Sequence, residues 1–510
     1  MDRRTLLETF VLGLAGAHLP LFATAASAQD SSKPFSFDSV IALAREAAGK
    51  PYNRPMMKLT EPFADLKYDQ YRAIRFRDDK RLFLGAGFQA ELLPPGFSYQ
   101  DKIEINVVTG GKVEPVAFST DFFAFHPNYF PYPDGRAPAG LGADMGFSGV
   151  RFRHPVNRPG VWDEFAVFQG ASYFRAVARD TLYGLSARGL AIGSGGSEPE
   201  EFPVFTRFWI EEPAPEDRVL RFSALLDSDS VTGAYDFSIE PGRETVTQLR
   251  VVLFPRRDIA SIGIAPLTSM YFFGPESRTG IDDFRNAVHD SDGLRMVNGS
   301  GERLWRPLRN PPGIETSAFS DENPRSFGLI QRARNFSDYE DAETHYERRP
   351  SAWVEPGEGW GKGAVMLVEI PSGDEFADNI VAFWRPETPL KEGSQVDLSY
   401  RLTWGLVQEE ELPFATVAAT RSGISILDTR ERVFAVDFDL GEITFSGVTP
   451  RIEVTAGQIK GLSVIELPAP GIVRVGFHFL PGEAKSAEFR LWLESEGVKA
   501  SEIWLYRWSV

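Results

Sequence analysis

The amino-acid sequence predicts an all-β protein, with a large β-sandwich followed by a smaller, immunoglobulin-like β-sandwich. Its 510 residues include 40 Phe, 14 Tyr and 10 Trp, together with 46 Gly and 36 Pro. Aromatic residues favour strands, and glycine and proline favour the turns that join them. Short stretches of alternating apolar and polar residues, separated by turn residues, occur along most of the chain. Because the sequence shows no repeat of roughly 20 to 50 residues, a sandwich is favoured over a solenoid or a propeller.

Individual elements follow from the local pattern. Residues 37–48 have the helical spacing of apolar residues, and Asp38 is expected to cap the N-terminus of this helix. Strands are predicted at residues 71–76, 102–108, 206–212, 235–241 and 246–254, and beyond an acidic stretch (408–411) at 432–440, 451–457, 471–480 and 487–495. About seven strands in roughly 100 residues suit an immunoglobulin-like sandwich. The predicted domains are therefore residues 29–407 and 412–510.

The first 28 residues, MDRRTLLETFVLGLAGAHLPLFATAASA, resemble a cleavable export signal of the twin-arginine type. Arg3 and Arg4 precede a mildly apolar run, and Ala26-Ser27-Ala28 supplies the small residues that a signal peptidase requires. The apolar run from Phe10 to Ala25 is shorter than the roughly 20 residues that span a bilayer, so cleavage is favoured over a membrane anchor. We therefore expect the mature protein to work in the periplasm.

The composition excludes several classes of function. The chain has no cysteine, which excludes disulfides, cysteine nucleophiles and thiolate metal sites. The 54 Lys and Arg against 71 Asp and Glu give a formal net charge of -17. Such a charge argues against nucleic acid and anionic lipid as partners and is compatible with a neutral ligand. The six histidines show no metal-ligand spacing, so no metal site is expected.

The middle of the chain carries a series of long, distinctive motifs. They are GIAPLTSMYFFGP (263–275), HDSDGL (289–294), GERLWRPLRNP (301–311), ENPRSFGLIQRARNFSDYED (322–341), RRPSAWVEP (348–356), WGKG (360–363) and DNIVAFWRP (378–386), with ASYFRA (171–176), YGLSARGLAI (183–192) and LDSDSVTGAY (226–235) further towards the N-terminus. In this order they resemble the osmoregulated periplasmic glucan biosynthesis proteins G and D. The twin-arginine leader is more similar to that of the D branch.

The resemblance implies a galactose-mutarotase-like β-sandwich joined to an immunoglobulin-like domain. It also implies action on β-1,2-glucan in the periplasm, similar to that of inverting endo-β-1,2-glucanases, without a cofactor. The family's two catalytic aspartates fall in the HDS and DNIV motifs, which here give Asp290 and Asp378. The resemblance further suggests a homodimer, in which a loop from one chain completes the cleft of the other.

Inverting hydrolysis of a glycoside needs one carboxylic acid that protonates the leaving oxygen and one carboxylate that activates water. Asp378 stands just before the apolar run of residues 380–384, so burial is expected to raise its pKa and make it the general acid. Asp290 lies in a polar loop, where solvent and hydrogen bonds are expected to keep it ionised as the general base. The two roles could be exchanged, and the base could act through waters and sugar hydroxyls.

Sugar binding calls for aromatic faces that pack on the pyranose ring, with polar side chains at the edges for the hydroxyls. The candidate platforms are Trp305, Tyr346, Trp353, Trp360 and Trp384, and the candidate polar partners are Arg306, Arg348, Arg349, Asp341 and Glu340. About half of such aromatic residues in a sandwich belong to the core. The aromatic and proline-rich residues 125–135 could line a cleft or form a packed surface loop.

Three functions remain open from the sequence. The first is an enzyme that cleaves inside β-1,2-glucan chains, and the second is a transglycosylase that cyclises or rearranges the same chains. The third is a non-catalytic glucan-binding scaffold that guides the polymer from a membrane glucan synthase, which would be a transient partner. The presence of both Asp290 and Asp378 favours an enzyme over a scaffold.

Overall fold

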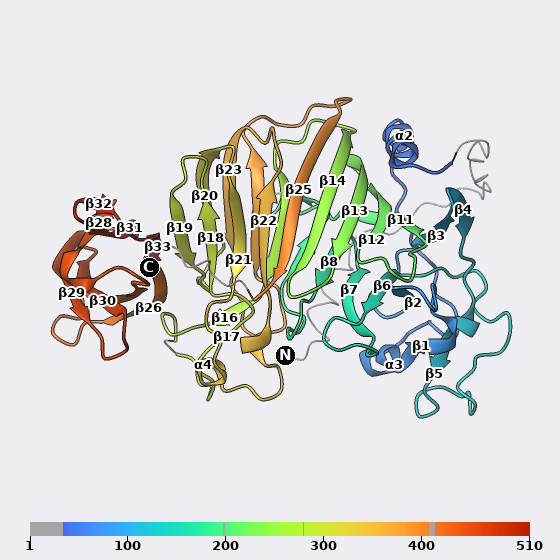
Figure 1. Ribbon diagram of the computed structural model, residues 1–510, viewed down its shortest axis with the longest axis horizontal. Helices are drawn as coiled ribbons and strands as arrows, with labels where there is room; N and C mark the ends of the chain where they lie inside the picture. The colour runs from blue at the N-terminus through green and yellow to red at the C-terminus, as the bar shows by residue number, and fades with distance from the viewer. Residues whose placement is uncertain (1–33, 197–198, 279, 407–413) are drawn as a thin grey trace.

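A computed structural model describes residues 34–196, 199–278, 280–406 and 414–510. The predicted leader (1–28) and the predicted domain boundary (408–411) lie outside these residues. Within them the protein is built almost entirely of strands, as predicted from the sequence. A large sandwich makes up most of the molecule, and a smaller one lies at one end of its long axis (Figure 1).

A ten-stranded sheet forms one layer of the large sandwich. Its strands follow the order β2-β6-β7-β8-β9-β15-β24-β23-β20, with β10 paired to β15. The strands are β2 (Gln89–Leu93), β6 (Gly149–His154), β7 (Asp163–Gln169), β8 (Tyr173–Ala176), β9 (Ser186–Arg188), β10 (Ala191–Ile192), β15 (Ile262–Ser269), β20 (Glu315–Glu322), β23 (Lys362–Glu369) and β24 (Ile380–Pro386).

A fifteen-stranded sheet forms the other layer and continues into the smaller sandwich. Its order is β28-β31-β33-β19-β18-β21-β22-β25-β14-β13-β12-β11-β3-β4, with β32 paired to β31. The strands are β3 (Glu104–Thr109), β4 (Lys112–Pro115), β11 (Val204–Glu211), β12 (Leu220–Asp227), β13 (Val231–Glu240), β14 (Thr245–Pro255), β18 (Gly293–Val297), β19 (Arg303–Pro307), β21 (Ser326–Ile330), β22 (Ser351–Pro356), β25 (Val396–Gly405), β28 (Val448–Val454), β31 (Ser486–Ser495), β32 (Val498–Lys499) and β33 (Ile503–Ser509). The two sandwiches meet where β33 runs parallel to β19, with Trp305 opposite Trp504.

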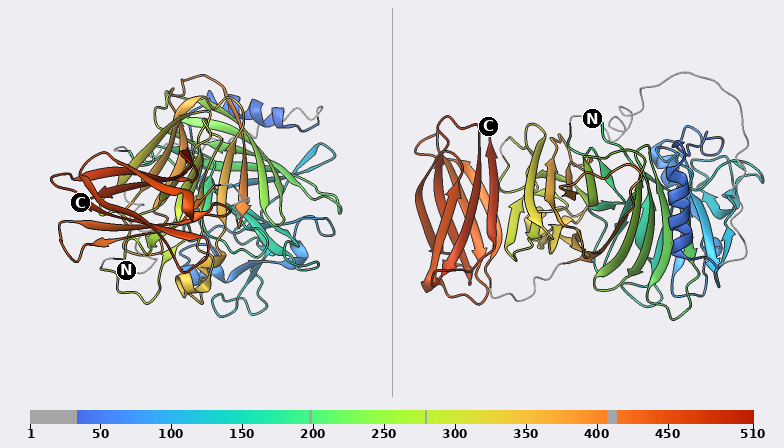
Figure 2. Two further views of the ribbon diagram at one scale, coloured as in Figure 1. Left: turned by 60° about the vertical axis from the view of Figure 1, so that its left-hand side comes forward. Right: turned by 90° about the horizontal axis from the view of Figure 1, so that it is seen from above.

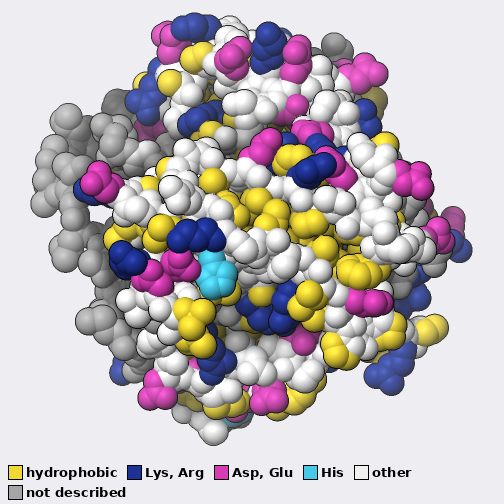
Figure 3. All heavy atoms as spheres, turned by 90° about the vertical axis from the view of Figure 1, so that its left-hand side faces the viewer, with side chains coloured by type: hydrophobic (Ala, Val, Ile, Leu, Met, Phe, Trp, Pro, Cys, Tyr) yellow, Lys and Arg dark blue, Asp and Glu magenta, His cyan; other side chains and the backbone are white. Residues whose placement is uncertain are grey.

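The smaller sandwich is completed by a four-stranded sheet. It contains, in spatial order, β26 (Thr416–Ile424), β27 (Arg432–Asp439), β30 (Ile472–Leu480) and β29 (Gln458–Glu466). Alternate residues of β30, from Val473 to Phe479, are buried against Phe489 and Leu491 of β31, which is the pattern of a strand with one face in a core. Figure 3 views this end of the molecule and shows apolar side chains mixed with charged ones on its surface.

The helix predicted at residues 37–48 is confirmed as α2 (Phe37–Ala48). It lies along the outer face of the fifteen-stranded sheet (Figure 2), where Val40 and Ala44 are buried against side chains such as Trp209 of β11. The expected cap at Asp38 is wrong, because the N-cap residue is Ser36 and Asp38 lies in the first turn. A carboxylate in the first turn still stabilises the helix through its dipole.

The predicted strand at residues 71–76 is only half correct. Residues Tyr68–Arg72 form the short helix α3, and the strand is reduced to β1 (Ile74–Phe76), which pairs with β5 (Phe123–Phe125). The other predicted strands are confirmed. The remaining elements are α4 (Phe336–Tyr339), β16 (Tyr271–Phe273), β17 (Val288–His289) and four 3-10 helices, η1 (Asp78–Lys80), η2 (Thr120–Phe122), η3 (Tyr346–Arg348) and η4 (Phe445–Gly447). Among the described residues, no helix is long and apolar enough to cross a membrane.

Candidate functional site

The two predicted aspartates flank one short segment of backbone, residues 269–271. On one side, Ser269 at the end of β15 pairs with Ile380 at the start of β24, two residues after Asp378. On the other side, the backbone N–H of Asp290 donates to the carbonyl of Met270 at 2.8 Å. The topology of the ten-stranded sheet therefore brings Asp290 and Asp378 to the same place. The charge of Asp378 is accordingly one of the causes that raise the pKa of Asp290, after burial.

The buried amide of Asn379 fixes this arrangement. Its Oδ1 accepts the backbone N–H of Tyr271 at 2.8 Å, and its Nδ2 donates to the carbonyls of Tyr271 (2.9 Å) and Ile370 (3.0 Å). A second contact joins the same elements, since the hydroxyls of Ser269 and Ser291 lie 2.9 Å apart. Each aspartate is thus next in sequence to a residue, Asn379 or Ser291, whose side chain bonds to residues 269–271.

Asp290 is the buried member of the pair. Its side chain is 10% exposed, and the nearest cation is Arg349, whose Nε lies 3.6 Å from Oδ1. This Oδ1 accepts no hydrogen bond from a described residue. Burial raises the pKa of Asp290 to about 6, an effect that Arg349 opposes and Asp378 reinforces. A buried carboxylate oxygen that accepts no hydrogen bond is costly for stability and marks a candidate functional atom.

Asp378 is the more accessible member, and its expected burial is wrong. Its side chain is 27% exposed, with Oδ2 at 3.6 Å from Nη2 of Arg175. Arg175 is held in turn by donating to Oγ of Ser186 at 2.6 Å. The apolar run after Asp378 belongs to β24 and enters the core only from Ile380 onwards, so it does not cover the carboxylate. Burial in the pair is therefore the reverse of what the sequence predicted.

Tyr346 and Asp341 lie in the same region. The hydroxyl of Tyr346 donates to Oε2 of Glu375 at 3.3 Å, and the guanidinium of Arg349 lies 5.4 Å from the centre of its ring. Burial raises the pKa of Tyr346 above its usual value, and the charges of Glu375 and Asp290 add to this effect. Tyr346 is therefore close to the carboxylate pair, but it is only 2% exposed and packs against Tyr339, so its ring is no more open to a sugar than that of Trp305.

Asp341 has a structural role beside the carboxylate pair. Its carboxylate accepts from the backbone amides of Glu343 and Thr344 and forms an ion pair with Arg285 at 2.8 Å. Although burial opposes it, these contacts hold the pKa of Asp341 below its usual value. Arg285 also pairs with Glu375 at 2.6 Å, so it links Asp341 to the partner of Tyr346.

Three of the predicted aromatic platforms are core residues. Trp384 is fully buried and its ring lies 6.1 Å from that of Trp360, whose Nε1 donates to the carbonyl of Ser399 at 3.2 Å. Trp305 is buried where the two sandwiches meet, and the guanidinium of Arg332 lies 3.6 Å over its ring. Trp360 and Trp384 have no face open to a sugar. Trp305 borders a cavity of about 740 Å³ together with His289 and Asp292, but the guanidinium of Arg332 covers its ring. The prediction that they bind substrate is corrected accordingly, because apolar residues of a strand read the same in sequence whether they face a core or a cleft.

The remaining candidates also lie apart from the aspartates. Arg306 is almost completely buried and pairs with Glu369 at 3.1 Å, so it is a structural residue and not a sugar ligand. Arg348 is exposed and donates to the carbonyl of Asp180 at 3.4 Å. Trp353 is half-buried, with a guanidinium 5.2 Å from the centre of its ring. The structure brings neither Arg348 nor Trp353 into contact with Asp290 or Asp378.

Of the two arginines that accompany the carboxylates, sequence reasoning missed Arg175 and singled out Arg349 only as a charged neighbour of the predicted aromatic platforms. Arg175 lies on β8 within the ASYFRA motif, and strand register places it on the same face as Arg151 of β6, since both are opposite Val167 of β7. That relation requires the order of the strands, which the local pattern does not reveal. Arg349 precedes β22, and its guanidinium donates to the carbonyl of Tyr183.

His289 and Asp292, which flank Asp290 in the HDSD stretch, have structural roles. The ring of His289 stacks on that of Tyr271 at 5.2 Å, and its Nδ1 lies 3.0 Å from Oε1 of Gln331. Burial lowers the pKa of His289, so the ring is neutral at pH 7. Asp292 accepts the backbone amides of Arg332 and Ala333. In the described part of the chain, no group of three or more His, Cys, Asp or Glu side chains is placed to hold a metal ion.

Comparison with known proteins identifies the same family as the sequence motifs do. A family model described as "Periplasmic glucan biosynthesis protein, MdoG" matches residues 35–508. The chain is similar to the glucans biosynthesis protein G of Vibrio cholerae, with 44% identity over 93% of this chain and 87% of that protein. It is also similar to the proteins of that name from Rhodopseudomonas palustris (43% identity) and Bradyrhizobium diazoefficiens (42% identity), with 100% of both chains covered in each case. These relatives carry the G name, and so they do not support the D branch that the leader suggested.

The structural role of Arg306 makes a prediction about stability. Arg306→Met should destabilise the protein by about 3–5 kcal/mol, because it leaves the buried carboxylate of Glu369 without its cation. The double variant Arg306→Met/Glu369→Gln should recover part of this loss, since glutamine can still accept the backbone N–H of Arg309. Urea unfolding of the two variants tests this. Unchanged stability with weakened glucan binding would restore Arg306 as a sugar ligand.

The buried state of Asp290 predicts a pH-dependent effect of Asp290→Asn. A carboxyl whose folded pKa is about 6 costs stability as pH rises from about 4 to about 6, because the unfolded chain ionises first. The neutral amide of the variant avoids this cost. The Asp290→Asn variant should therefore be more stable than the wild type by up to about 3 kcal/mol near pH 7.5 and equally stable near pH 3.5.

Thermal unfolding at the two pH values measures the difference. Asp378→Asn is the matched control, because its side chain is 27% exposed and remains hydrated. A wild type that stays more stable than Asp290→Asn near neutral pH would show that Asp290 is not held in an unfavourable ionised state.

Proposed function

The chain belongs to the periplasmic glucan biosynthesis protein family, and on that premise we propose that it is a periplasmic enzyme that cleaves β-1,2-glucan with inversion. One observation carries the proposal. Residues 269–271 bring together a buried carboxylate, Asp290, and a more accessible one, Asp378, each with an arginine at 3.6 Å. Two carboxyl groups in different environments are what acid–base cleavage of a glycosidic bond requires.

Asp290 suits the role of general base. With a pKa of about 6 it is mostly ionised at neutral pH and is still more basic than an ordinary aspartate. Its Oδ1 is free of hydrogen bonds from described residues and can accept a proton. Because Asp290 is buried, we propose that the proton of the attacking water reaches it through an intervening water or sugar hydroxyl.

Asp378 suits the role of general acid. Its accessible carboxyl can approach the glycosidic oxygen of a bound glucan, whereas that of Asp290 is buried. In the reaction, the water oxygen bonds to the anomeric carbon while the bond to the leaving oxygen breaks. Asp378 gives its proton to that oxygen, and the proton of the water goes to Asp290. Asp378 as acid and Asp290 as base are the roles expected from the sequence. The reasons differ, because Asp290 and not Asp378 is the buried residue.

Two alternatives use the same site. In a transglycosylase, a hydroxyl of a second glucan unit replaces the water, and the same pair of carboxyls serves. In a non-catalytic scaffold, the glucan would bind without reaction, and a buried Asp290 oxygen that accepts no hydrogen bond would have no purpose. That oxygen therefore favours an enzyme over a scaffold.

Incubation with linear β-1,2-glucan, followed by mass spectrometry of the products, tests the function. The wild type should release shorter reducing oligosaccharides, while Asp378→Asn and Asp290→Asn should each lose activity by at least about 100-fold. Asp374→Asn is the matched control, because Asp374 lies in the same loop and accepts only a local backbone amide. Masses lower by one water would indicate cyclising transfer, and glucan binding without any reaction would indicate a scaffold.

The two roles separate in the same assay. A β-1,2-linked oligosaccharide with a good leaving group should restore much of the activity of Asp378→Asn, because that group needs no proton. It should not help Asp290→Asn, which azide should rescue instead as a nucleophile that needs no base. The opposite pattern would exchange the two roles.

We also propose that the protein forms a homodimer through the loop between β26 and β27. Ile426 and Leu427 at its tip are 98% and 87% exposed, which is unusual for adjacent large apolar side chains. Transient contact with a membrane glucan synthase stays a prediction from the family resemblance.

Light scattering tests the dimer. The wild type should have the mass of two chains, and Ile426→Asp should have the mass of one. Val498→Asp is the control, because Val498 is 69% exposed on the same sandwich but lies outside this loop. A monomeric wild type, or a dimer that Val498→Asp alone disrupts, would contradict the proposal.

A further inference from the structure

A run of four aromatic side chains lies outside the site described above. Tyr68 and Tyr71 come from α3, and Phe97 and Tyr99 come from the turn after β2. The distances between ring centres are 5.9 Å for Tyr68–Phe97, 6.4 Å for Phe97–Tyr71 and 5.4 Å for Tyr71–Tyr99. Tyr68 is 37% exposed and the other three are half-buried, so the run begins at the surface. We call these four residues the aromatic strip.

The aromatic strip leads to the carboxylate pair. Burial raises the pKa of Tyr99, and the opposing charge that acts on it is that of Arg175, which also faces Asp378 at 3.6 Å. A Cβ placed on Gly170, in the turn between β7 and β8, would lie 3.5 Å from the ring of Tyr99. Tyr99 therefore covers the strand connection that precedes β8, the strand whose Arg175 faces Asp378.

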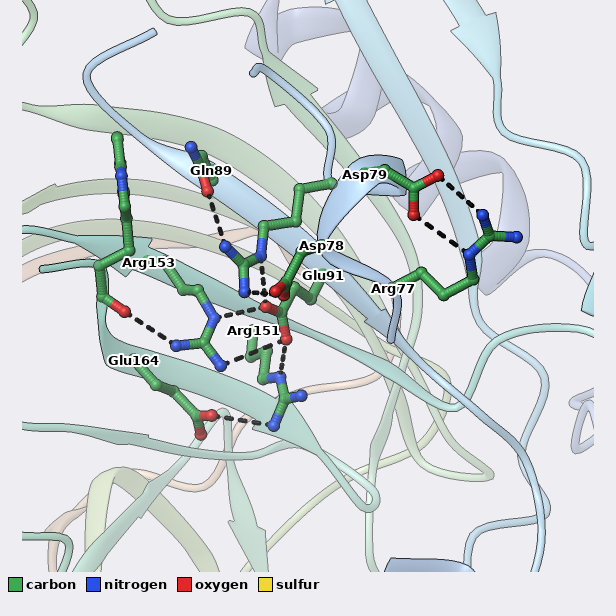
Figure 4. Close-up of polar contacts among 10 residues, drawn as sticks. Arg77, Asp78, Asp79, Gln89, Glu91, Arg151, Arg153 and Glu164 are labelled. Atoms are coloured by element: carbon green, nitrogen blue, oxygen red, sulfur yellow. Dashed lines mark hydrogen bonds and ion pairs between the residues drawn. The ribbon is translucent and has the colours of Figure 1, made fainter. Parts of the chain in front are cut away.

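Charged side chains on and beside β2 and β6 of the ten-stranded sheet pair with one another. Glu91 of β2 is only 1% exposed and receives contacts from Arg81, Arg151 and Arg153. Figure 4 shows Arg151 and Arg153 of β6 pointing towards Glu91 of β2. Because the arginines are committed to Glu91, they do not make this part of the sheet a binding site for anions. A neutral ligand is the better match.

The rings themselves are held in place. The hydroxyl of Tyr71 accepts from Nε2 of Gln169 at 2.7 Å and donates to the carbonyl of Pro94 at 3.1 Å. Phe97 has a φ of 56°, which is unusual for a bulky residue and costs about 1–3 kcal/mol. This strained conformation is the one in which the Phe97 ring stands between those of Tyr68 and Tyr71. Rings that are fixed in advance lose little entropy when a ligand packs on them.

We infer that Tyr68, Phe97 and Tyr99 form an outer binding site for a neutral glucose polymer, at a distance from the bond that is cleaved. Pyranose rings pack their C–H faces on aromatic rings, and tyrosine hydroxyls bond the sugar edges. Successive rings of the strip are inclined by 59°, 31° and 39°. Rings inclined to one another in this way suit a chain whose direction changes from unit to unit better than a flat, ribbon-like polysaccharide. The identity of the polymer as β-1,2-glucan rests on the proposed function.

Binding measurements on an inactive background test this inference. In Asp378→Asn, the further changes Tyr68→Ala and Phe97→Asn remove two rings, and asparagine tolerates the positive φ at residue 97. The dissociation constant for long linear β-1,2-glucan should rise about tenfold. The dissociation constant for oligosaccharides just long enough to span the carboxylate pair should not change.

Phe414→Ala in the same background is the matched control, because Phe414 is an aromatic residue 36% exposed just before β26 of the smaller sandwich. Equal affinity of the strip variant and its parent for long chains would overturn the inference, as would an equal loss in Phe414→Ala. A parent that does not bind β-1,2-glucan at all would also overturn it.

The result is independent of the catalytic test. If the wild type cleaves glucan but the strip variant binds normally, the inference fails and the proposed function stands. If nothing is cleaved but the strip variant loses long-chain binding, the proposed activity fails and the outer site stands as part of a scaffold.

Discussion

The candidate site depends on the backbone hydrogen bonds that the Asn379 amide makes across the end of the ten-stranded sheet. Three bonds, to both backbone groups of Tyr271 and to the carbonyl of Ile370, leave the buried amide with no unused donor. Any shift of β24 against residues 269–271 would break bonds that water cannot replace at a buried position. The carboxylates on either side are therefore placed by the register of the sheet, although both belong to loops.

Two arrangements of arginine and carboxylate in this molecule show that the distance between the charges affects whether a carboxylate is structural or available for reaction. Glu91 is in direct contact with three arginines, and although burial opposes it, these charges hold its pKa below the usual value. Asp290 and Asp378 each have an arginine at 3.6 Å, beyond a good hydrogen bond. The first arrangement neutralises a carboxylate and stabilises the sheet. The second leaves the carboxylates able to exchange protons.

Much of the fold follows from local sequence. Alternation along segments such as residues 471–480 identifies strands with one buried face, and the apolar spacing of residues 37–48 identifies the helix. The sequence pattern does not predict the role of a side chain when that role depends on which residues it packs against. Trp384 and Arg306 look like sugar ligands, but they face the interior, and only the packing of the sheets shows this. The two aspartates follow from motif resemblance, whereas Arg175 requires the register of three neighbouring strands.

The pairing of β19 with β33 has a consequence for how the chain could be divided. Hydrogen bonding runs from the large sandwich into the small one through Leu304 opposite Ile503 and Trp305 opposite Trp504. A fragment without the C-terminal sandwich would present β19 as a bare, apolar sheet edge, with Leu304 and Trp305 uncovered. Such an edge is a template for intermolecular strand pairing. The small sandwich thus covers an edge of the large one that would otherwise promote aggregation. We therefore expect the two sandwiches to stay soluble only when they are expressed together.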